Sequence, residues 1–525
     1  MRALYKETLQ AKNGATVPVY NSGKPAHSKY NPEQEAQNFL PHANGLLFAL
    51  VFGAGGGFHV ASLLERNPGC KALVVERSAA DLDFLKRNVP CVASLYENPN
   101  VIFCAAEIPG QMERLLLDNY LPAWHGDLQM AALRSWAGEA GGLYESLLER
   151  AQNALKAISA DYSVQARFGG LWQRNIFCNL KVLKNAQERA DQAAALFGHE
   201  QFCGKTAAII AAGPTLDQTI QKIKNSPDKY WTIATDTGWK ILRRLGMRAD
   251  AVVSIDAQHL SAEHFNAPIC KDTIFVLDLA ANPSIANYAY ERGAKIVFAN
   301  CGHPLISFAA RFCERPFIRL SSGGGTVAIA AADFAKQLGF EKIEIFGADF
   351  GYSCGKPYAK GSYLDDLYRF KESRAATAES AFSRLMFRTP LEKNADGFLQ
   401  SDVLLSYQKS LEDFLGKGNF EREENVWKAS FYKGTFAREK AQDLALSNKL
   451  DFTAFKAALL DAAKRIEASD ELSADAAPLL PGMAWIKARL AAERQNAHCG
   501  AENKISTKEA KKLALNKILL YNSLL

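Results

Sequence analysis

Short apolar runs alternate with amphipathic segments in the first part of the chain. The runs at 46–52 (LLFALVF), 71–75 (KALVV) and 101–104 (VIFC) have the length of buried strands, and helix-like segments separate them. This alternation is typical of α/β layering. After about Gly142 the pattern becomes helical and charged. We therefore predict an α/β domain over residues 1–160.

A second alternating stretch follows a polar, helical connector. Its helical intervals are long enough for right-handed crossovers between parallel strands. These features predict a central α/β domain over residues 161–400 with a mostly parallel sheet. The expected strands are 206–211, 231–235, 250–255, 273–278, 295–300 and 342–346.

The pattern changes again at about Gln400, because no strand-like run is evident beyond it. Apolar residues recur there at helical spacing, with Lys and Arg on the remaining face. We therefore predict an all-helical C-terminal domain over residues 401–525, which would contact a protein partner and would be dispensable for nucleotide binding.

Composition narrows the class of protein. The chain has 525 residues, a net charge of +6, 22% charged and 48% hydrophobic residues. This mix is that of a globular protein and excludes a disordered, collagen-like or coiled-coil chain. Lys and Arg form no dense block, which argues against a strongly basic nucleic-acid binder.

The cysteines and the apolar runs indicate the compartment. The ten cysteines are scattered without a CxxC pair, so neither a structural zinc site nor a disulfide framework is expected. The first residues lack the apolar core of a secretory signal. The longest apolar run, 46–52, is far shorter than a membrane span. We expect a cytoplasmic protein without a membrane span.

A glycine-rich loop, Gly53–Gly57, joins the first predicted strand to a helix, and Glu76 ends the next strand. This layout is that of Rossmann-like domains, in which such a loop approaches a phosphate and the acidic residue accepts from ribose hydroxyls. The alternative is a tight turn in a domain that binds no ligand. The sequence leaves both interpretations open.

The central domain places polar residues where its predicted strands end. Gly213, Pro214 and Thr215 form a strand-to-helix turn suited to a phosphate. Asp236 and Asp256 end neighbouring strands, and Asp349 follows the last one. Because ligands of open parallel sheets bind at this edge, we expect these residues to line one pocket. The small residues of SSGGGT (321–326) precede a helix in the same way.

The motifs GPTLD, SIDAQH, SSGGGTVAIA and GADFGY resemble the central domain of motility-associated factor (Maf) proteins, which are flagellin glycosyltransferases. The same domain occurs in 6-hydroxymethylpterin pyrophosphokinase-like proteins. The N-terminal VFGAGGGFHVASLLE and the linking FGGLWQRNIFCNL also fit the Maf layout. The resemblance covers most of the chain.

The central domain is also similar to bacterial sialyltransferases with a variant GT-A fold. That similarity implies that SSGGG binds a cytidine nucleotide and that Tyr352 and Tyr358 hold its phosphate. The implied nucleotide-sugar-binding residues are Gly213, Pro214, Thr215, Asp236, Ser322, Gly323, Gly324, Tyr352 and Tyr358. Those enzymes use a downstream histidine as general base, but no His lies between 303 and 498. Asp349 and Asp256 are therefore the candidate catalytic residues, with the departing phosphate as a further alternative.

The resemblances imply a glycosyltransferase that moves a nonulosonic acid from a CMP-activated donor to Ser or Thr of flagellin. The alternatives are a pterin pyrophosphokinase-like phosphotransferase and a non-enzymatic flagellin-binding or export factor. The glycosyltransferase hypothesis requires no cofactor. Three aspartates at one edge would suit Mg²⁺, which the pyrophosphokinases need. Nucleic acid is not an expected partner.

Overall fold

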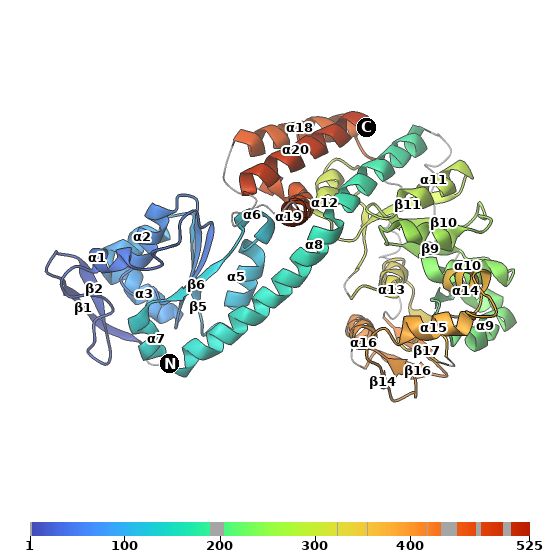
Figure 1. Cartoon of the computed structure of the whole chain (residues 1–525), viewed down its shortest axis with the longest axis horizontal. Coiled ribbons are helices and arrows are strands. Elements are labelled where there is room, and N and C mark those ends of the chain that lie inside the picture. Colours follow the sequence, from blue (N-terminus) through green and yellow to red (C-terminus); the bar gives the residue numbers. More distant parts are fainter. Residues whose placement is uncertain are drawn as a thin grey trace. The chain divides into compact units, whose positions relative to one another are not determined.

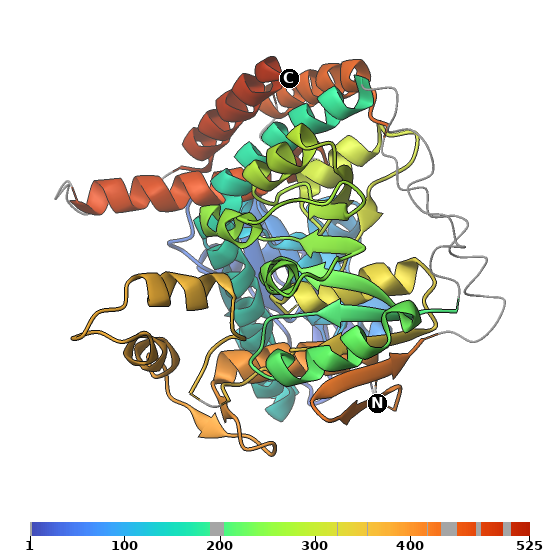
Figure 2. The same ribbon diagram turned by 90° about the vertical axis from the view of Figure 1, so that its right-hand side faces the viewer.

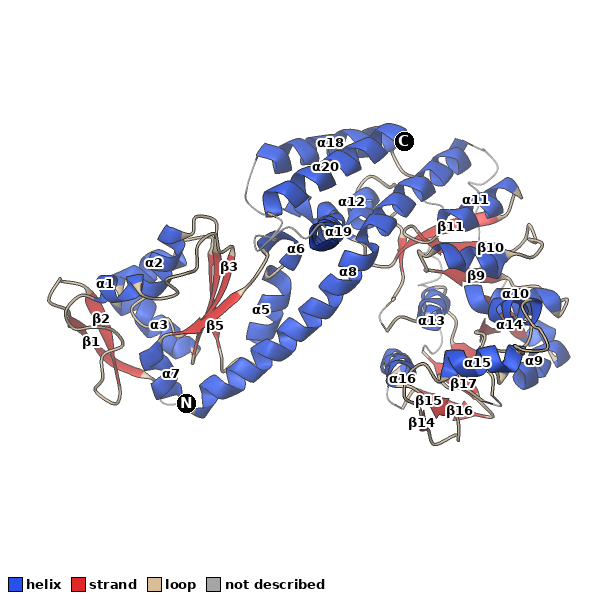
Figure 3. Ribbon diagram, in the orientation of Figure 1, coloured by secondary structure: helices blue, strands red, loops and turns tan. Residues whose placement is uncertain are grey.

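The computed structural model describes residues 3–188, 204–322, 324–353, 355–416, 418–431, 449–468, 474–496 and 506–525. These residues form two compact units (Figure 1). Unit 1 comprises Met1–Gly170 and Ala462–Ile518, and unit 2 comprises Leu171–Asp461 and Leu519–Leu525. Both have the predicted α/β character, and helices and strands alternate along them (Figure 3). The prediction of an α/β fold with mostly parallel sheets is confirmed.

Unit 1 is built on a four-stranded parallel sheet in the order β5-β4-β3-β6. One of its two inner strands, β3 (Phe48–Phe52), is buried at every position, as its uninterrupted apolar sequence predicts. A separate antiparallel pair, β1 with β2, precedes the sheet. The other elements are β1 (Tyr5–Gln10), β2 (Thr16–Tyr20), α1 (Pro32–Gln37), α2 (Phe58–Arg66), β4 (Lys71–Glu76), α3 (Ala79–Asn88), α4 (Pro90–Tyr96), β5 (Val101–Ala105), α5 (Gln111–Asn119), α6 (Pro122–His125), β6 (Gln129–Ala132) and α7 (Arg134–Ala140).

In three helices one part of the residues belongs to unit 1 and the other part to unit 2. They are α8 (Gly142–Glu188), α18 (Phe452–Ala468) and α20 (Thr507–Leu524). The short helix η5 (Ala474–Leu479) and α19 (Leu480–Asn496) belong to unit 1. Two glycines let α8 approach α19 closely, because a Cβ atom at Gly169 would lie 1.8 Å from the Pro481 carbonyl oxygen and one at Gly170 would lie 2.5 Å from the Trp485 ring.

Unit 2 contains a nine-stranded sheet in the order β12-β11-β10-β9-β8-β7-β13-β17-β16. The first seven strands in that order are parallel. Helix α13 packs on one face and helices α9, α10 and α11 lie on the other (Figures 1 and 2). The elements are β7 (Thr206–Ile210), α9 (Leu216–Asn225), η3 (Pro227–Lys229), β8 (Tyr230–Thr235), α10 (Asp236–Arg244), β9 (Ala251–Ser254), η4 (His259–Phe265), β10 (Ile274–Asp278), α11 (Pro283–Glu291), β11 (Lys295–Asn300), α12 (Pro304–Ala310), β12 (Ile318–Arg319), α13 (Val327–Gln337), β13 (Lys342–Phe346), α14 (Tyr363–Phe370), α15 (Ala378–Met386), β14 (Glu392–Lys393), β15 (Leu399–Gln400), α16 (Asp402–Leu415), β16 (Phe420–Glu423) and β17 (Val426–Ser430).

The strand order of this sheet reverses at one place. From β7 the chain adds strands in one direction as far as β12, and it then returns to place β13 on the other side of β7. The carboxyl ends of β7 and β13 therefore form a switch point in the topology, which is where an open parallel sheet is expected to have a ligand-binding crevice.

The described residues of 401–525 are mainly helical, as predicted, but the prediction that they contain no strand is wrong. Strands β16 and β17 lie in that range, and β17 pairs antiparallel with β13, so they extend the main sheet. Glu424 and Asn425, at the turn between them, have φ of 47° and 62°. Two such residues in succession make the mirror-image turn typical of a tight hairpin, although the sequence lacks the usual glycine. Deleting 401–525 would remove part of the sheet, so this region is not a dispensable module.

In the part of the chain that is described, no helix combines the length and apolar character needed to cross a lipid bilayer.

Candidate functional site

Thr215 and Asp349 join the two sides of the expected crevice between β7 and β13. The Thr215 backbone N–H donates to Asp349 Oδ2 at 2.8 Å, and its hydroxyl donates to Oδ1. Gly213 donates to the Gly347 carbonyl oxygen at 2.7 Å. A Cβ atom at Gly213 would lie 2.6 Å from the Asp349 carboxyl carbon, so only glycine fits there. The beginning of α9, predicted to receive a phosphate, thus holds a carboxylate of the protein itself.

Asp349 is 2% exposed. Burial raises the pKa of its carboxyl group, while the hydrogen bonds from Thr215 act in the opposite direction. Because Asp349 is buried and each of its carboxylate oxygens already accepts from Thr215, a ligand has little access to it. This geometry favours a brace between β7 and β13 over the predicted catalytic role. It likewise gives Gly213 and Thr215, with the buried Pro214 between them, a packing role.

The carboxyl ends of the next strands carry further aspartates. Asp236, 2% exposed at the start of α10, accepts from the Thr237 N–H at 2.7 Å and from the Ser254 hydroxyl at 3.0 Å. Its pKa is raised to about 6, mainly by burial and slightly by the charge of Asp256, while the hydrogen bonds from Thr237 and Ser254 act in the opposite direction. Asp256 is only half-buried, and its Oδ1 accepts from the Gln258 N–H at 2.9 Å. Asp256 is thus the more accessible carboxylate of the two.

Tyr352 and Tyr358 interact electrostatically with Arg388 and Tyr407, which come from other elements. We call these four residues the tyrosine cluster. Burial raises the pKa of Tyr358, as do the charges of Tyr352, Asp236 and Tyr407, whereas Arg388 lowers it. Arg388 also lowers the pKa of Tyr352, which burial raises. Since such interactions weaken with distance, these groups lie in the neighbourhood of the Tyr358 phenol. Tyr358 is 36% exposed, so a ligand in solution can reach it.

Backbone hydrogen bonds hold the loop that carries these tyrosines. Tyr352 exchanges two of them with Leu399, at 2.8 and 3.1 Å, and the Ala359 N–H donates to the Ala212 carbonyl oxygen at 2.8 Å. The loop is thereby attached to the turn that follows β7. Lys356, between the tyrosines, lies 4.0 Å from the Asp217 carboxylate and is partly exposed, which favours a solvated loop lysine.

The predicted nucleotide-binding loop before α13 packs against α16. The Ser322 hydroxyl donates to the Cys301 carbonyl oxygen at 3.0 Å. A Cβ atom at Gly324 would lie 2.3 Å from Ser410 Cβ, and one at Gly325 would lie 2.9 Å from the Tyr407 ring. Gly323, predicted to contact the nucleotide, lies outside the described residues. These glycines therefore make room for α16, which brings Tyr407 to the cluster.

Sequence reasoning missed Arg388 and Tyr407. Arg388 is exposed just after α15, and Tyr407 is half-buried on α16, in a region assigned to a separate helical domain. Neither residue belongs to a recognisable motif. The topology that returns the chain to the edge of the sheet brings them to the tyrosines.

The N-terminal glycine loop is filled by side chains of unit 1. A Cβ atom at Gly53 would lie 2.4 Å from the Trp136 ring, and one at Gly55 would lie 2.5 Å from Leu133. Glu76 is fully buried, and its carboxylate accepts from the Ala54 and Arg77 N–H groups, the Tyr5 hydroxyl and the Trp136 indole. This arrangement favours a tight turn without a bound nucleotide.

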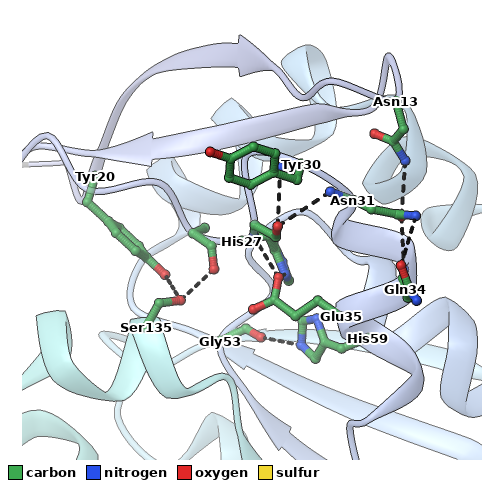
Figure 4. Close-up of polar contacts among 12 residues, drawn as sticks. Asn13, Tyr20, His27, Tyr30, Asn31, Gln34, Glu35, Gly53, His59 and Ser135 are labelled. Carbon is green, nitrogen blue, oxygen red and sulfur yellow. Dashed lines mark hydrogen bonds and ion pairs between the residues drawn. The ribbon is translucent and has the colours of Figure 1, made fainter.

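Two buried histidines complete the surroundings of that loop (Figure 4). His59 Nε2 lies 3.0 Å from the Gly53 carbonyl oxygen, and His27 Nδ1 lies 3.7 Å from the Glu35 carboxylate. The two imidazole centroids are 5.4 Å apart. Burial lowers the pKa of His59 to about 3, so its ring is neutral. Among the described residues, no group of three or more His, Cys, Asp and Glu side chains is placed to hold a metal ion.

Comparison with known proteins identifies relatives of part of the chain. Residues 178–355 match the family model described as 6-hydroxymethylpterin diphosphokinase MptE-like. The match covers β7–β13 and less than half of the chain. It confirms the predicted resemblance to pyrophosphokinase-like proteins.

Two uncharacterized proteins of Treponema pallidum (strain Nichols) are similar in sequence. One is 31% identical over 157 residues, which are 30% of this chain and 71% of that protein. The other is 38% identical over 140 residues, which are 26% of this chain and 49% of that protein, so the chain spans about half the length of that relative. The chain belongs to the same family as the first of these proteins.

A solved structure, the MAf glycosyltransferase from Magnetospirillum magneticum AMB-1, aligns with all of this chain and 91% of its own. The TM-score is 0.49 and the sequence identity 14%. It is a member of the group that the sequence motifs resemble.

The buried aspartates predict a pH dependence of stability. Asp278, 5% exposed at the end of β10, accepts from the Cys301 N–H at 3.0 Å, and burial raises its pKa from 3.8 to about 6. The folded state therefore favours the protonated form. This contribution is fully present below about pH 4 and is lost as the pH rises through about 6, by roughly 1–3 kcal/mol.

Asp278→Asn, which cannot ionise, should gain stability relative to the natural chain by that amount between pH 4 and 7. Urea denaturation at both pH values measures the change. Asp228→Asn, at an exposed position on η3, controls for the loss of one carboxylate. If the free energy of unfolding changed equally with pH in the natural chain and in Asp278→Asn, ionisation of Asp278 would not reduce the stability of the fold.

Proposed function

We propose that unit 2 is a glycosyltransferase that binds a CMP-activated nonulosonic acid at the carboxyl edge of its sheet and transfers the sugar to Ser or Thr of flagellin in the cytoplasm. The observation that carries the proposal is the position of the loop with Tyr352 and Tyr358, which the Ala359–Ala212 hydrogen bond attaches to the turn after β7. The charge of Arg388 is near enough to lower the pKa of both phenols. The donor, the acceptor and the compartment follow from the motif-level resemblance to Maf proteins and sialyltransferases.

The tyrosine cluster has the chemistry that a leaving phosphate needs. Two phenol groups donate hydrogen bonds, and a guanidinium presents a fork of N–H donors that matches phosphate oxygens. Both kinds of donor stabilise the negative charge that develops on the phosphate when the glycosidic bond breaks. The exposure of Tyr358 and Arg388 gives a nucleotide access to them.

Asp256 is the proposed general base. The acceptor hydroxyl oxygen attacks the anomeric carbon, the bond from that carbon to the phosphate oxygen breaks, and CMP leaves with the electron pair. The hydroxyl proton moves to the Asp256 carboxylate. Asp256 suits this role better than Asp349, because it is accessible and the described hydrogen bonds engage one of its oxygens.

The aspartates at this edge do not fit a magnesium site. Both carboxylate oxygens of Asp349 and of Asp236 accept hydrogen bonds from the protein. Magnesium keeps several of its waters when it binds protein, and among these three carboxylates only that of Asp256 is accessible to a hydrated ion, because Asp236 and Asp349 are buried. We therefore assign the phosphate to the tyrosines and Arg388, and derive no step through a metal.

The match to the MptE-like family favours a second candidate, a pyrophosphokinase that transfers diphosphate from ATP. Calorimetry separates the two. Binding of CMP without Mg²⁺ supports the glycosyltransferase, and binding of ATP only with Mg²⁺ supports the pyrophosphokinase. Binding of neither nucleotide supports the third alternative, a flagellin-binding factor without catalysis.

Removing phosphate donors should weaken CMP binding. We expect Tyr358→Phe and Arg388→Met each to raise the Kd for CMP by about tenfold, the effect of losing one charge-assisted hydrogen bond. Isothermal titration calorimetry measures both.

Matched controls are available close by. Tyr363→Phe removes a phenol whose electrostatic neighbours are Glu263 and Tyr368, outside the cluster, and Arg384→Met removes an exposed arginine from α15. Both should keep the natural affinity. If Tyr358→Phe and Arg388→Met bind CMP as tightly as these controls, CMP does not occupy the tyrosine cluster.

Asp256→Asn should reduce turnover without loss of nucleotide affinity. Asparagine keeps the size and the acceptor oxygen for Gln258 but cannot take the proton, so we expect a rate loss on the order of 10²-fold or more. Mass spectrometry of flagellin follows modification, and calorimetry on the same sample reports CMP affinity. Normal turnover in this variant would assign the proton to another acceptor, the departing phosphate being the remaining one.

A further inference from the structure

Unit 1 contains a cavity of about 800 Å³ that has no part in the proposed transfer reaction. Residues from α6, the loop before β6, α8, α19 and the start of α20 line it. Every one of those residues belongs to unit 1, so the cavity is a feature of one compact body. Its size is that of small-molecule sites, which span about 300–1,000 Å³.

The wall of this cavity is mainly apolar. Tyr120 and Ile158 are buried, Leu155 and Tyr162 are half-buried, and all four line it. A smaller cavity of about 200 Å³ shares Tyr120, Ile158 and Tyr162 with the first one and continues between apolar side chains. The two together accommodate an elongated apolar body.

One cation lies in this apolar surrounding. Lys487 is half-buried on α19, and its ammonium donates to the Thr507 hydroxyl oxygen at 3.0 Å. The same hydroxyl donates to the Trp124 carbonyl oxygen at 2.9 Å, so Thr507 fixes the position of the ammonium. Burial lowers the pKa of Lys487 to about 8, although the negative charge of Asp127 acts in the opposite direction. An ammonium has three protons, so an anionic ligand can accept from it alongside Thr507.

We propose that this cavity binds a small amphipathic monoanion, with its carboxylate or sulfonate group on Lys487 and its apolar body against Tyr120, Tyr162 and Ile158. A single negative charge suits the site better than a nucleotide or another polyanion, because the exposed Asp127 also lines it and opposes additional negative charge. The apolar wall supplies affinity and Lys487 supplies selection by charge.

Two fluorescent probes test both parts of this proposal on the full chain. 1-Anilinonaphthalene-8-sulfonate (ANS) has an apolar aromatic body and one negative charge, whereas N-phenyl-1-naphthylamine has the same kind of body without the charge. Lys487→Met should raise the Kd for ANS at least about tenfold and leave the neutral probe almost unchanged. Lys487→Arg keeps the charge and should stay within about threefold of the natural chain.

Control variants separate the cavity from the rest of the surface. Ala488→Trp, at an exposed lining position, should block the mouth and weaken both probes. Lys508→Met removes an exposed lysine from α20 outside the lining and should change neither. Far-UV circular dichroism and the melting temperature establish that each variant is folded, and Lys487→Gln replaces Lys487→Met if the latter is not.

A competition on the natural chain needs no variant. Octanoate should displace ANS, and octyltrimethylammonium, which has the same tail with a positive charge, should not. Equal ANS affinity in the natural chain and Ala488→Trp would overturn the assignment of the cavity. Equal affinity in Lys487→Met, or equal displacement by the two octyl compounds, would overturn the role of Lys487.

Discussion

The two hydrogen bonds from Thr215 to the Asp349 carboxylate close the place where the order of strands reverses. In an open parallel sheet this crevice is where a ligand is expected, and the N–H groups at the start of the following helix attract an anion. Here the group at that position is the side-chain carboxyl group of Asp349. These bonds reinforce the backbone pairing of β7 with β13, and the separate Ala359–Ala212 hydrogen bond attaches the tyrosine loop beside them. The candidate site, which is the tyrosine cluster, therefore lies beside the place where β7 and β13 meet.

In the glycine-rich segments too, a side chain of the protein fills the space where a ligand was expected. Gly213 makes room for Asp349, Gly325 for Tyr407 and Gly53 for Trp136. In each case the missing Cβ atom admits another part of the chain. A glycine loop between a strand and a helix therefore indicates a close approach, but its spacing does not identify what approaches. In unit 1 the approaching groups leave no role for Glu76 in binding ribose.

Local patterns predicted much of the fold. The buried strands β3, β4, β7, β8 and β10 are short, mainly apolar runs, and their length indicates strands. Strand β17 was missed because its sequence VWKAS is short and mixed, and because pairing with β13 determines its conformation. Asp349, Tyr352 and Tyr358 were predicted from motifs, whereas Arg388 and Tyr407 reach the cluster through tertiary packing. The partner of Asp349 was likewise hidden, since Thr215 lies on another strand-to-helix turn far away in the sequence.

A double-mutant cycle on Thr215 and Asp349 tests the central claim, that their interaction braces the sheet. Hydrogen exchange of the β7 and β13 amides gives the free energy of opening in the natural chain, Thr215→Val, Asp349→Asn and the double variant. The account predicts a coupling energy of about 1–3 kcal/mol, as for contacting residues. Because Thr215→Val keeps its backbone N–H, the cycle measures the hydroxyl bond. Effects that add to within about 0.3 kcal/mol would show that the Thr215 hydroxyl does not interact with Asp349 in solution, and would contradict the account.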